Sequence, residues 1–322
     1  MPEGYGLVIT SFILFTIYYL GSRGVQIGFD TFRYEATFSA YENSSSFFIR
    51  KDPFFDYLTF IFSKFLDFKA LLLFCSTIYI LGAFYAFRLI FKEYYYLPFL
   101  VFLIYPYFMN MGINVIRSGV SSSLFLVGIG VFYRHQSLKK ALFWISISIM
   151  FHISMLIPLL FFICGVFLKN TKIIFIIWLI SIIMAFLGIN VIANFISIIA
   201  NFTSRIGNYA VNDGGESSWI NFIMFGFFPV IFAVYFILIK KYKDNFYTWL
   251  VNAYMLIHIP YIILINTQFA SRIGYLAEFM MPLLLMYPLL IGKKTEIHFF
   301  NFKLCILIFI VFLVKGYKVL IV

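Results

Sequence analysis

Residues 70–91, ALLLFCSTIYILGAFYAFRLIF, form one apolar run with a single charged side chain, Arg88. A helix needs roughly 20 mainly apolar residues to cross a bilayer, and this run has that length. Similar runs recur along the chain, and we place spanning helices at residues 5–20, 70–91, 94–111, 114–133, 141–152, 154–168, 172–190, 219–239, 245–265, 273–291 and 300–314. The pattern predicts an all-α, polytopic integral membrane protein with about eleven spans, within a range of about 10–12.

The composition supports this class. Of the 322 residues, 63% are hydrophobic and 11% are charged, whereas about 25% of a soluble domain is charged. We therefore expect one transmembrane domain over residues 1–322, without an attached soluble domain. The net charge of +11 does not indicate a nucleic-acid partner, because much of it lies in turns where membrane orientation explains it.

Lysine and arginine lie on opposite sides of the predicted topology. Lysines gather in four turns, at Lys139/Lys140, Lys169/Lys172, Lys240/Lys241/Lys243 and Lys293/Lys294. The alternate connections carry Arg23, Arg33, Arg50, Arg117, Arg205 and Arg272, and only Arg88 and Arg134 join the lysines. Cytoplasmic turns are enriched in both residue types, so arginines on the far side need another explanation. Their planar guanidinium groups suggest recognition of a phosphate.

With the lysine turns in the cytoplasm, two far-side segments are long enough to build a site: residues 21–69 and 191–218. Within the first, residues 53–66 carry Asp56 and Lys64, so we expect a helix at the membrane interface, with a crossing as the alternative. The second begins apolar and ends in NDGGESS, which suggests an amphipathic piece followed by a mobile loop, a place for a lid over a substrate. All four lysine turns lie on the same side of the membrane only if residues 141–168 form two spans with a break near residue 152.

One group of polar residues follows the first predicted span, and a second group starts a later span. Asp30, Arg33 and Tyr34 share one face of a helical turn; they are candidates for a site, or a solvated loop with a local ion pair. Asn114 and Arg117 start a spanning helix, where an arginine is costly and usually faces a wet cavity or a partner. Unpaired backbone N–H groups at that helix start would also favour an anion. The alternative for Arg117 is snorkelling to the headgroups.

The predicted helix break and the later far-side segments supply further candidates. His152 lies at the break, and a histidine titrates near neutral pH, which suits proton transfer; a bond to the backbone is the other possibility. Glu278 is an acid inside a span, for which Arg117 and His152 are the possible partners. The remaining candidates for substrate binding are Arg205, Arg272 and Tyr275.

No metal or cofactor is expected. The four histidines are dispersed and lack carboxylates at ligand spacing, and the cysteines Cys75, Cys164 and Cys305 lack paired spacing. No phosphate-binding glycine loop is present either. A donor phosphate should then be lipid-linked and external.

Taken in order, these motifs resemble the EpsG/Wzy-like polymerases of bacterial surface polysaccharides. The resemblance rests on Asp30 with Tyr34, Asn114-x-x-Arg117, Phe151-His152-x-Ser154 and Arg272-x-x-Tyr275, and covers most of the chain. Two positions depart from the family pattern: Ser118 stands where the family has a glutamine, and Asp52 stands for the acid before residues 53–66.

The resemblance implies a glycosyltransferase with a GT-C-like architecture and periplasmic loops over the site, in the bacterial inner membrane. It implies transfer of a chain on undecaprenyl pyrophosphate to the non-reducing sugar of a lipid-linked repeat unit, as in O-antigen and lipopolysaccharide assembly. Arginines would stabilise the diphosphate leaving group without a metal. Expected partners are the lipid-linked donor and acceptor, a chain-length regulator and a flippase.

Residue roles follow as expectations from this implied reaction. Arg117 and Arg272, helped by Arg205 and Arg33, would bind the pyrophosphate. Either His152 or Asp30 would accept the proton of the acceptor hydroxyl, and Tyr34 and Asn114 would orient sugars or phosphate. The rival functions are an O-antigen ligase, which uses the same donor with another acceptor, and a lipid-linked oligosaccharide flippase.

Overall fold

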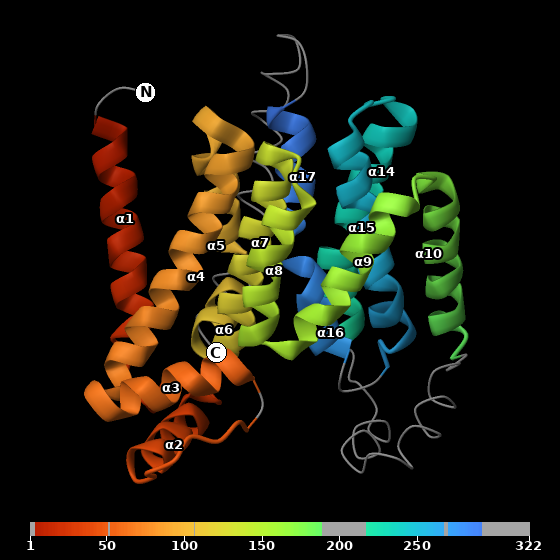
Figure 1. Ribbon diagram of the computed structural model, residues 1–322. Helices are drawn as coiled ribbons and strands as arrows, with labels where there is room; N and C mark the ends of the chain where they lie inside the picture. The colour runs from red at the N-terminus through yellow and green to blue at the C-terminus, as the bar shows by residue number, and fades with distance from the viewer. Residues whose placement is uncertain (1–3, 51, 106, 189–216, 267–269, 292–322) are drawn as a thin grey trace. The chain divides into compact units, whose positions relative to one another are not determined.

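The computed structural model describes residues 4–50, 52–105, 107–188, 217–266 and 270–291. Helices make up all the regular secondary structure in these ranges (Figure 1), which confirms the predicted all-α class. Five of the described helices are long and apolar enough to cross a membrane, and a sixth is added if one bent pair counts as a span. The chain is therefore a multi-pass membrane protein, whereas the count of about eleven spans stays a prediction.

Two compact units succeed each other along the chain, with the change between Leu156 and Ile157. The first unit contains α1 (Gly4–Gly21), α2 (Thr31–Glu42), α3 (Pro53–Phe65), α4 (Phe68–Phe91), α5 (Tyr96–Ile104), α6 (Tyr107–Ile113), α7 (Ile116–His135) and α8 (Leu138–Phe151). The second contains α9 (Leu156–Phe167), α10 (Thr171–Phe186), α13 (Ser217–Asn221), α14 (Phe228–Val234), α15 (Asn245–Ile263), α16 (Ala270–Glu278) and α17 (Met281–Leu290).

Helix α7 is the centre of the first unit and packs against both α4 and α8. Hydroxyl groups connect these helices: Ser123 Oγ donates to the Tyr79 carbonyl at 2.6 Å, and Ser148 Oγ donates to the Ser121 carbonyl at 2.6 Å. Small residues and hydroxyls are the usual contacts between membrane helices, because lipid removes the hydrophobic drive for helix association. The helices of this core therefore meet through small polar groups.

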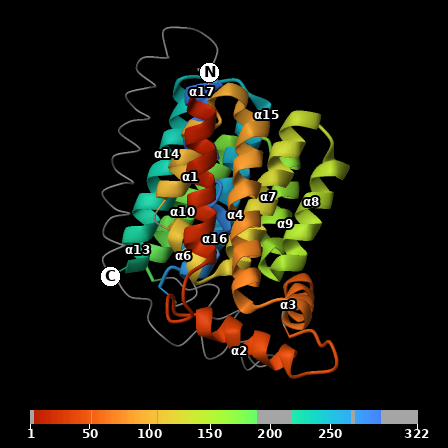
Figure 2. The same ribbon diagram turned by 90° about the vertical axis from the view of Figure 1, so that its left-hand side faces the viewer.

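Helices α2 and α3 lie at one end of the first unit and run across the direction of α1, α4 and α7 (Figure 2). The two charged side chains of α3, Asp56 and Lys64, stabilise this arrangement. Lys64 Nζ donates to the Tyr41 and Glu42 carbonyls at 2.8 and 3.0 Å, which satisfies the end of α2. Asp56 Oδ2 accepts the backbone N–H groups of Arg50 and Asp52 at 2.8 and 3.2 Å. Residues 53–65 thus form a short helix held at the end of α2, and its place at the membrane interface stays a prediction.

In the second unit α15 packs against α10 and α16, and α14 packs against α17. The stretch from Trp219 to Ile239 is one long helix whose turns at Phe222–Phe227 and Tyr235–Ile239 are π-helical. The first of these wide turns precedes Pro229, which lacks an N–H group to donate to that turn. The helix predicted at 219–239 is therefore confirmed as one that is long and apolar enough to span a membrane.

Prolines explain where the structure departs from the predicted spans. Residues 94–111 form two helices, α5 and α6, bent by 76°; Tyr105, which precedes Pro106, has ψ 127, as expected of a residue before proline. The prediction at 273–291 is confirmed as one candidate span, Arg272–Leu290, in which α16 gives way to α17 just before Pro282. The predicted break near residue 152 is confirmed, because α8 ends at Phe151. The span at 300–314 and residues 191–216 of the second far-side segment lie outside the described residues.

Helix α7 ends in a left-handed residue that is not glycine, which makes a stability test possible. Gln136 has φ 51 and ψ 30, a conformation that costs side-chain-bearing residues about 1–2 kcal/mol. We expect Gln136→Gly to raise the melting temperature in detergent, by a free energy of up to about 1 kcal/mol. Gly119→Ala should do the opposite, because its Cβ would lie 2.5 Å from the Met111 carbonyl oxygen. A lower melting temperature for Gln136→Gly would contradict this reasoning.

Candidate functional site

A buried carboxylate joins three distant parts of the first unit. Asp52, 1% exposed, accepts hydrogen bonds from Arg117 Nη1 to Oδ2 and from the backbone N–H of Ile153 to Oδ1, the latter at 3.0 Å. His152 Nδ1 lies 3.4 Å from the same Oδ2. An ionised carboxylate can only accept, so this contact places the imidazole proton on Nδ1 and leaves Nε2 as the acceptor of a neutral ring.

The local sequence explains why Asp52 is free to make these bonds. Asp52 precedes Pro53 and occupies the N-cap position of α3, yet its side chain does not cap that helix. Proline at the first helical position has no N–H group to satisfy, and Asp56 holds the turn by accepting the Asp52 N–H. The carboxylate of Asp52 is therefore available to groups from α7 and from the break after α8.

Arg117 lies in the first turn of α7, and no side chain caps this helix. Its guanidinium carbon lies 5.8 Å from the ring centroids of both Tyr34 and Phe55, a cation–π arrangement. Its Nε is buried and has no hydrogen-bond partner in the described part of the chain. The side chains of Arg117 and His152 keep 20% and 21% of their surface exposed, so both can be reached from outside the protein core.

The charges around the site set the protonation of its two acids. Burial by itself would raise the pKa of Asp52, but the hydrogen bonds from His152 and Ile153 and the charge of Arg117 outweigh it and lower that pKa. Burial raises the pKa of the Tyr34 hydroxyl, and the neighbouring Arg117 only partly offsets this effect. Near neutral pH the site therefore combines an anionic Asp52, a cationic Arg117 and a phenol that keeps its proton.

The lowered pKa gives a prediction for stability against pH. A carboxylate with a depressed folded-state pKa stabilises the fold fully above the unfolded value, about 3.9, and loses this effect as the pH falls through the folded value. We expect the melting-temperature difference between wild type and Asp52→Asn not to shrink between about pH 7 and 5, and to shrink below about pH 4. Thermal unfolding in detergent at a series of pH values measures it. A difference that shrinks between pH 7 and 5 would contradict the assignment.

Of the first sequence-predicted group, only Tyr34 lies in this cluster. Its ring contacts Phe55 edge-on, with centroids 5.7 Å apart, and lies beside the Arg117 guanidinium, whose carbon is 5.8 Å from the ring centroid. Asp30 and Arg33 pair with each other at 3.0 Å, with side-chain exposures of 33% and 70%. The ion-pair alternative of the sequence analysis thus holds for these two residues.

Asn114 connects two pieces of backbone. Its Oδ1 accepts the N–H of Phe29 at 2.7 Å, and its Nδ2 donates to Asn110 Oδ1 at 2.8 Å. The loop before α2 approaches closely here: Gly28 has φ +97, and an added Cβ would lie 2.7 Å from Asn114 Oδ1. In this structure Asn114 therefore holds the loop that leads to Tyr34, and its role toward sugar or phosphate stays a prediction.

The predicted residues of the second unit lie on α16. Glu278 is 2% exposed, and its charge acts on Tyr254 and Tyr261. Arg272 is exposed in the first turn of α16, at the start of a candidate span, and Tyr275 is half-buried. Pairing of Glu278 with Arg117 or His152 stays a prediction, and Arg205 lies outside the described residues.

Sequence reasoning did not assign a role to Asp52. Its position before a helix-starting proline marks it as a helix cap, and nothing local reveals partners 65 and 100 residues away. The sequence did offer one signal. Arg117 at a helix start, His152 at a helix break and Asp52 in the far-side segment 21–69 are three polar residues predicted on the same side of the membrane. Neither Arg117 nor His152 has a partner nearby in the sequence. Among the described residues, no group of three or more His, Cys, Asp or Glu side chains could hold a metal ion.

Comparison with known proteins identifies the family. The sequence model of the EpsG family matches residues 6–321. No curated protein and no solved structure gives a significant match to this chain. Because the family match covers nearly the whole sequence, the chain belongs to the EpsG family, a membership that suggests a polysaccharide repeat-unit polymerase.

Proposed function

We propose that this protein polymerises undecaprenyl-pyrophosphate-linked oligosaccharide repeat units on the periplasmic face of the bacterial inner membrane. The donor is the growing chain on its lipid pyrophosphate, and the acceptor is the non-reducing end of a new lipid-linked unit. Family membership supports the polymerase class. The arginines on the side opposite the lysine turns support the external face and the phosphate-bearing donor.

The observation that carries the mechanism is the shared carboxylate. Asp52 binds Arg117 through Oδ2 and stands 3.4 Å from His152 Nδ1, so one buried anion orients a cation and a base. A histidine held by a carboxylate through one nitrogen presents the other nitrogen as a general base. Asp30 is committed to Arg33 on an exposed turn, and we therefore assign the base to His152.

The reaction follows from these positions. The acceptor hydroxyl oxygen attacks the anomeric carbon of the donor sugar, and its proton passes to His152 Nε2. The bond between that carbon and the diphosphate oxygen breaks, and its electron pair leaves with the lipid pyrophosphate. Negative charge grows on this leaving group in the transition state, where a fixed guanidinium stabilises it more than in the bound donor.

Arg117 suits the leaving group in two ways. Its side chain keeps 20% of its surface exposed, so guanidinium N–H groups other than the one bonded to Asp52 can face a ligand. It lies in the first turn of α7, where backbone N–H groups and the helix dipole also favour an anion. We assign a second contact with the leaving group to the hydroxyl of Tyr34, whose ring lies beside the Arg117 guanidinium.

The test uses the polysaccharide profile of cells that lack the gene, complemented by wild type or by Arg117→Ala, on a silver-stained gel. In the deletion strain, the proposal predicts that the ladder collapses to a single capped repeat unit. Wild type should restore the ladder, and Arg117→Ala should not. Loss of every unit from the acceptor would instead indicate a ligase or a flippase. An unchanged ladder in the deletion strain would reject the proposal.

A further inference from the structure

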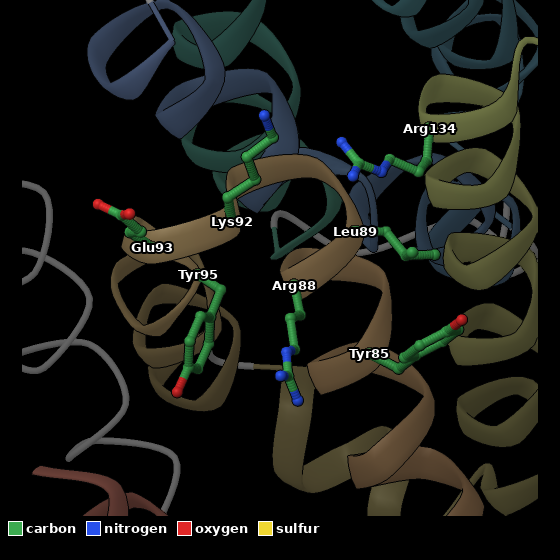
Figure 3. Close-up of a pocket in the computed structure, with 7 residues that line it drawn as sticks. All are labelled: Tyr85, Arg88, Leu89, Lys92, Glu93, Tyr95 and Arg134. Atoms are coloured by element: carbon green, nitrogen blue, oxygen red, sulfur yellow. The ribbon is translucent and has the colours of Figure 1, made fainter. Parts of the chain in front are cut away.

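A second polar feature of the first unit lies at the opposite end of α4 and α7 from Asp52. Both helices start at the end that carries α2 and α3, and α7 has 20 residues, a length of about 30 Å. Arg88 in the last turn of α4 and Arg134 in the last turn of α7 line a pocket of about 480 Å³ there (Figure 3). The remaining walls include Lys92, Glu93, Tyr85 and Tyr95.

The pocket holds an excess of positive charge. No carboxylate in the described residues comes within 4.0 Å of the charged groups of Arg88, Lys92 or Arg134, since the ion pairs found there lie elsewhere. In Figure 3 the Glu93 side chain points away from Lys92 and Arg134. Among the described residues, three cationic side chains thus line one concavity with a single acid, Glu93, which makes no ion pair with them.

Membrane orientation and helix dipoles explain why cations lie at this end, but they do not explain the concavity. Lys92 adds a conformational argument. It has φ 49 and ψ −106, in a region that side-chain-bearing residues rarely adopt. Strained residues of this kind tend to lie where the surroundings hold a side chain for a purpose. Glycine would adopt this backbone conformation without strain, yet the turn after α4 has a lysine there, at the rim of the pocket.

Two further lysines lie beside the end of α7. An adjoining pocket of about 400 Å³ shares Tyr85 and is lined by His135, Lys139 and Lys140, together with Phe143. Exposed apolar surface is part of these walls and continues along α4: Tyr85 is 47% and Phe143 62% exposed, and Leu81, one helical turn before Tyr85, is 43% exposed. A ligand with an anionic head and a long apolar tail matches this combination of charge and surface.

We propose that this pocket binds the phosphate headgroup of an anionic phospholipid. Arg88 and Arg134 offer planar forks to phosphate oxygens, Lys92 adds a point charge, and the acyl chains lie along the exposed residues Leu81 and Phe143. Basic pockets between membrane helices on the cytoplasmic side are suited to such headgroups. This site is independent of the Asp52 cluster and of the proposed polymerisation.

The test is native mass spectrometry of the full-length protein in neutral detergent, titrated with phosphatidylglycerol. Arg88→Gln combined with Arg134→Gln should weaken binding about tenfold or more, a loss of two charge-assisted contacts. Lys241→Gln combined with Lys243→Gln removes the same charge from another lysine turn, so this control should keep wild-type affinity. Equal affinity of the pocket variant and wild type would overturn the proposal.

Two further measurements distinguish lipid from other ligands and from misfolding. Inorganic phosphate or diphosphate at millimolar concentration should not displace the lipid; displacement would assign the pocket to a soluble phosphate compound and reject the lipid. Lys92→Gly relieves the left-handed backbone while removing a cation, so it should raise the melting temperature and still weaken lipid binding. Gln136→Gly is the control, because it also introduces glycine at a residue of positive φ, without a change of charge. Unchanged binding by Lys92→Gly would count against the pocket.

Discussion

Arg117→Lys is expected to abolish polymer formation while the protein still folds and inserts. Lysine keeps the positive charge and can reach Asp52, but it lacks the planar fork that binds two oxygens of a diphosphate. Removing one preorganised donor from a developing charge typically costs about 10²–10³-fold in rate. The amount and length distribution of polysaccharide from complemented cells, normalised to the amount of membrane-inserted protein, measures the effect.

The matched control is Arg50→Lys. Arg50 lies at the same end of the first unit, but its guanidinium stacks on Tyr41 and Phe48 at 5.8 and 5.1 Å. An exposed cation–π contact contributes only about 0.5–1 kcal/mol, so this variant should support a normal ladder. Full polymer formation by Arg117→Lys would reject the diphosphate role of Arg117 and leave it an ion-pair partner of Asp52.

The second large effect is expected from the Asp52–His152 pair. His152→Asn should lower the rate about 10²–10⁴-fold, the usual loss on removing a general base. Asp52→Asn should approach this loss, because an amide can donate to the ring and reverse the imidazole tautomer. If the two side chains act as one unit, the double variant should be no slower than His152→Asn alone.

Asp52 is assigned a positioning role, so its test needs a measurement that simple destabilisation would not change. We expect Asp52→Asn to alter the pH dependence of polymerisation in reconstituted vesicles as well as its maximum. Asp67→Asn is the control: Asp67 caps α4 through the Ala70 N–H at 2.8 Å, and asparagine caps a helix equally well. Additive losses in the Asp52–His152 cycle, with an unchanged pH profile, would show a purely structural carboxylate.

The apolar helices and their order followed from hydrophobic length, whereas α2 and the break at His152 did not. The break was predictable because the lysine turns agree with one membrane side only if residues 141–168 cross twice. The helix at 53–66 was predictable, and its interfacial placement stays a prediction that rests on Asp56 and Lys64, which do not suit a bilayer core. The bend between α5 and α6 was missed, although Pro106 stands between them and Tyr105 takes the extended backbone that a following proline favours.

The candidate site was predictable only in part, because its bonds join residues far apart in the sequence. Arg117 and His152 each stood out as a polar side chain in an apolar context. Their common partner did not, since an acid before a proline-started helix looks like an ordinary cap. Asp30 was a candidate because it forms a dense local motif with Arg33 and Tyr34. In the structure Asp30 and Arg33 form an exposed ion pair, whereas Tyr34 lies beside Arg117.

The bond from the Ile153 N–H to Asp52 has a consequence for biosynthesis. The two residues are 101 positions apart, so at a translation rate of about 5–20 residues per second the carboxylate waits on the order of 5–20 s for its partner. An unpaired charge is costly to bury, and Arg117 emerges only during this interval. We therefore expect the segment with α2 and α3 to stay in the aqueous interface during synthesis and to close over the helix bundle only after α8 has been inserted.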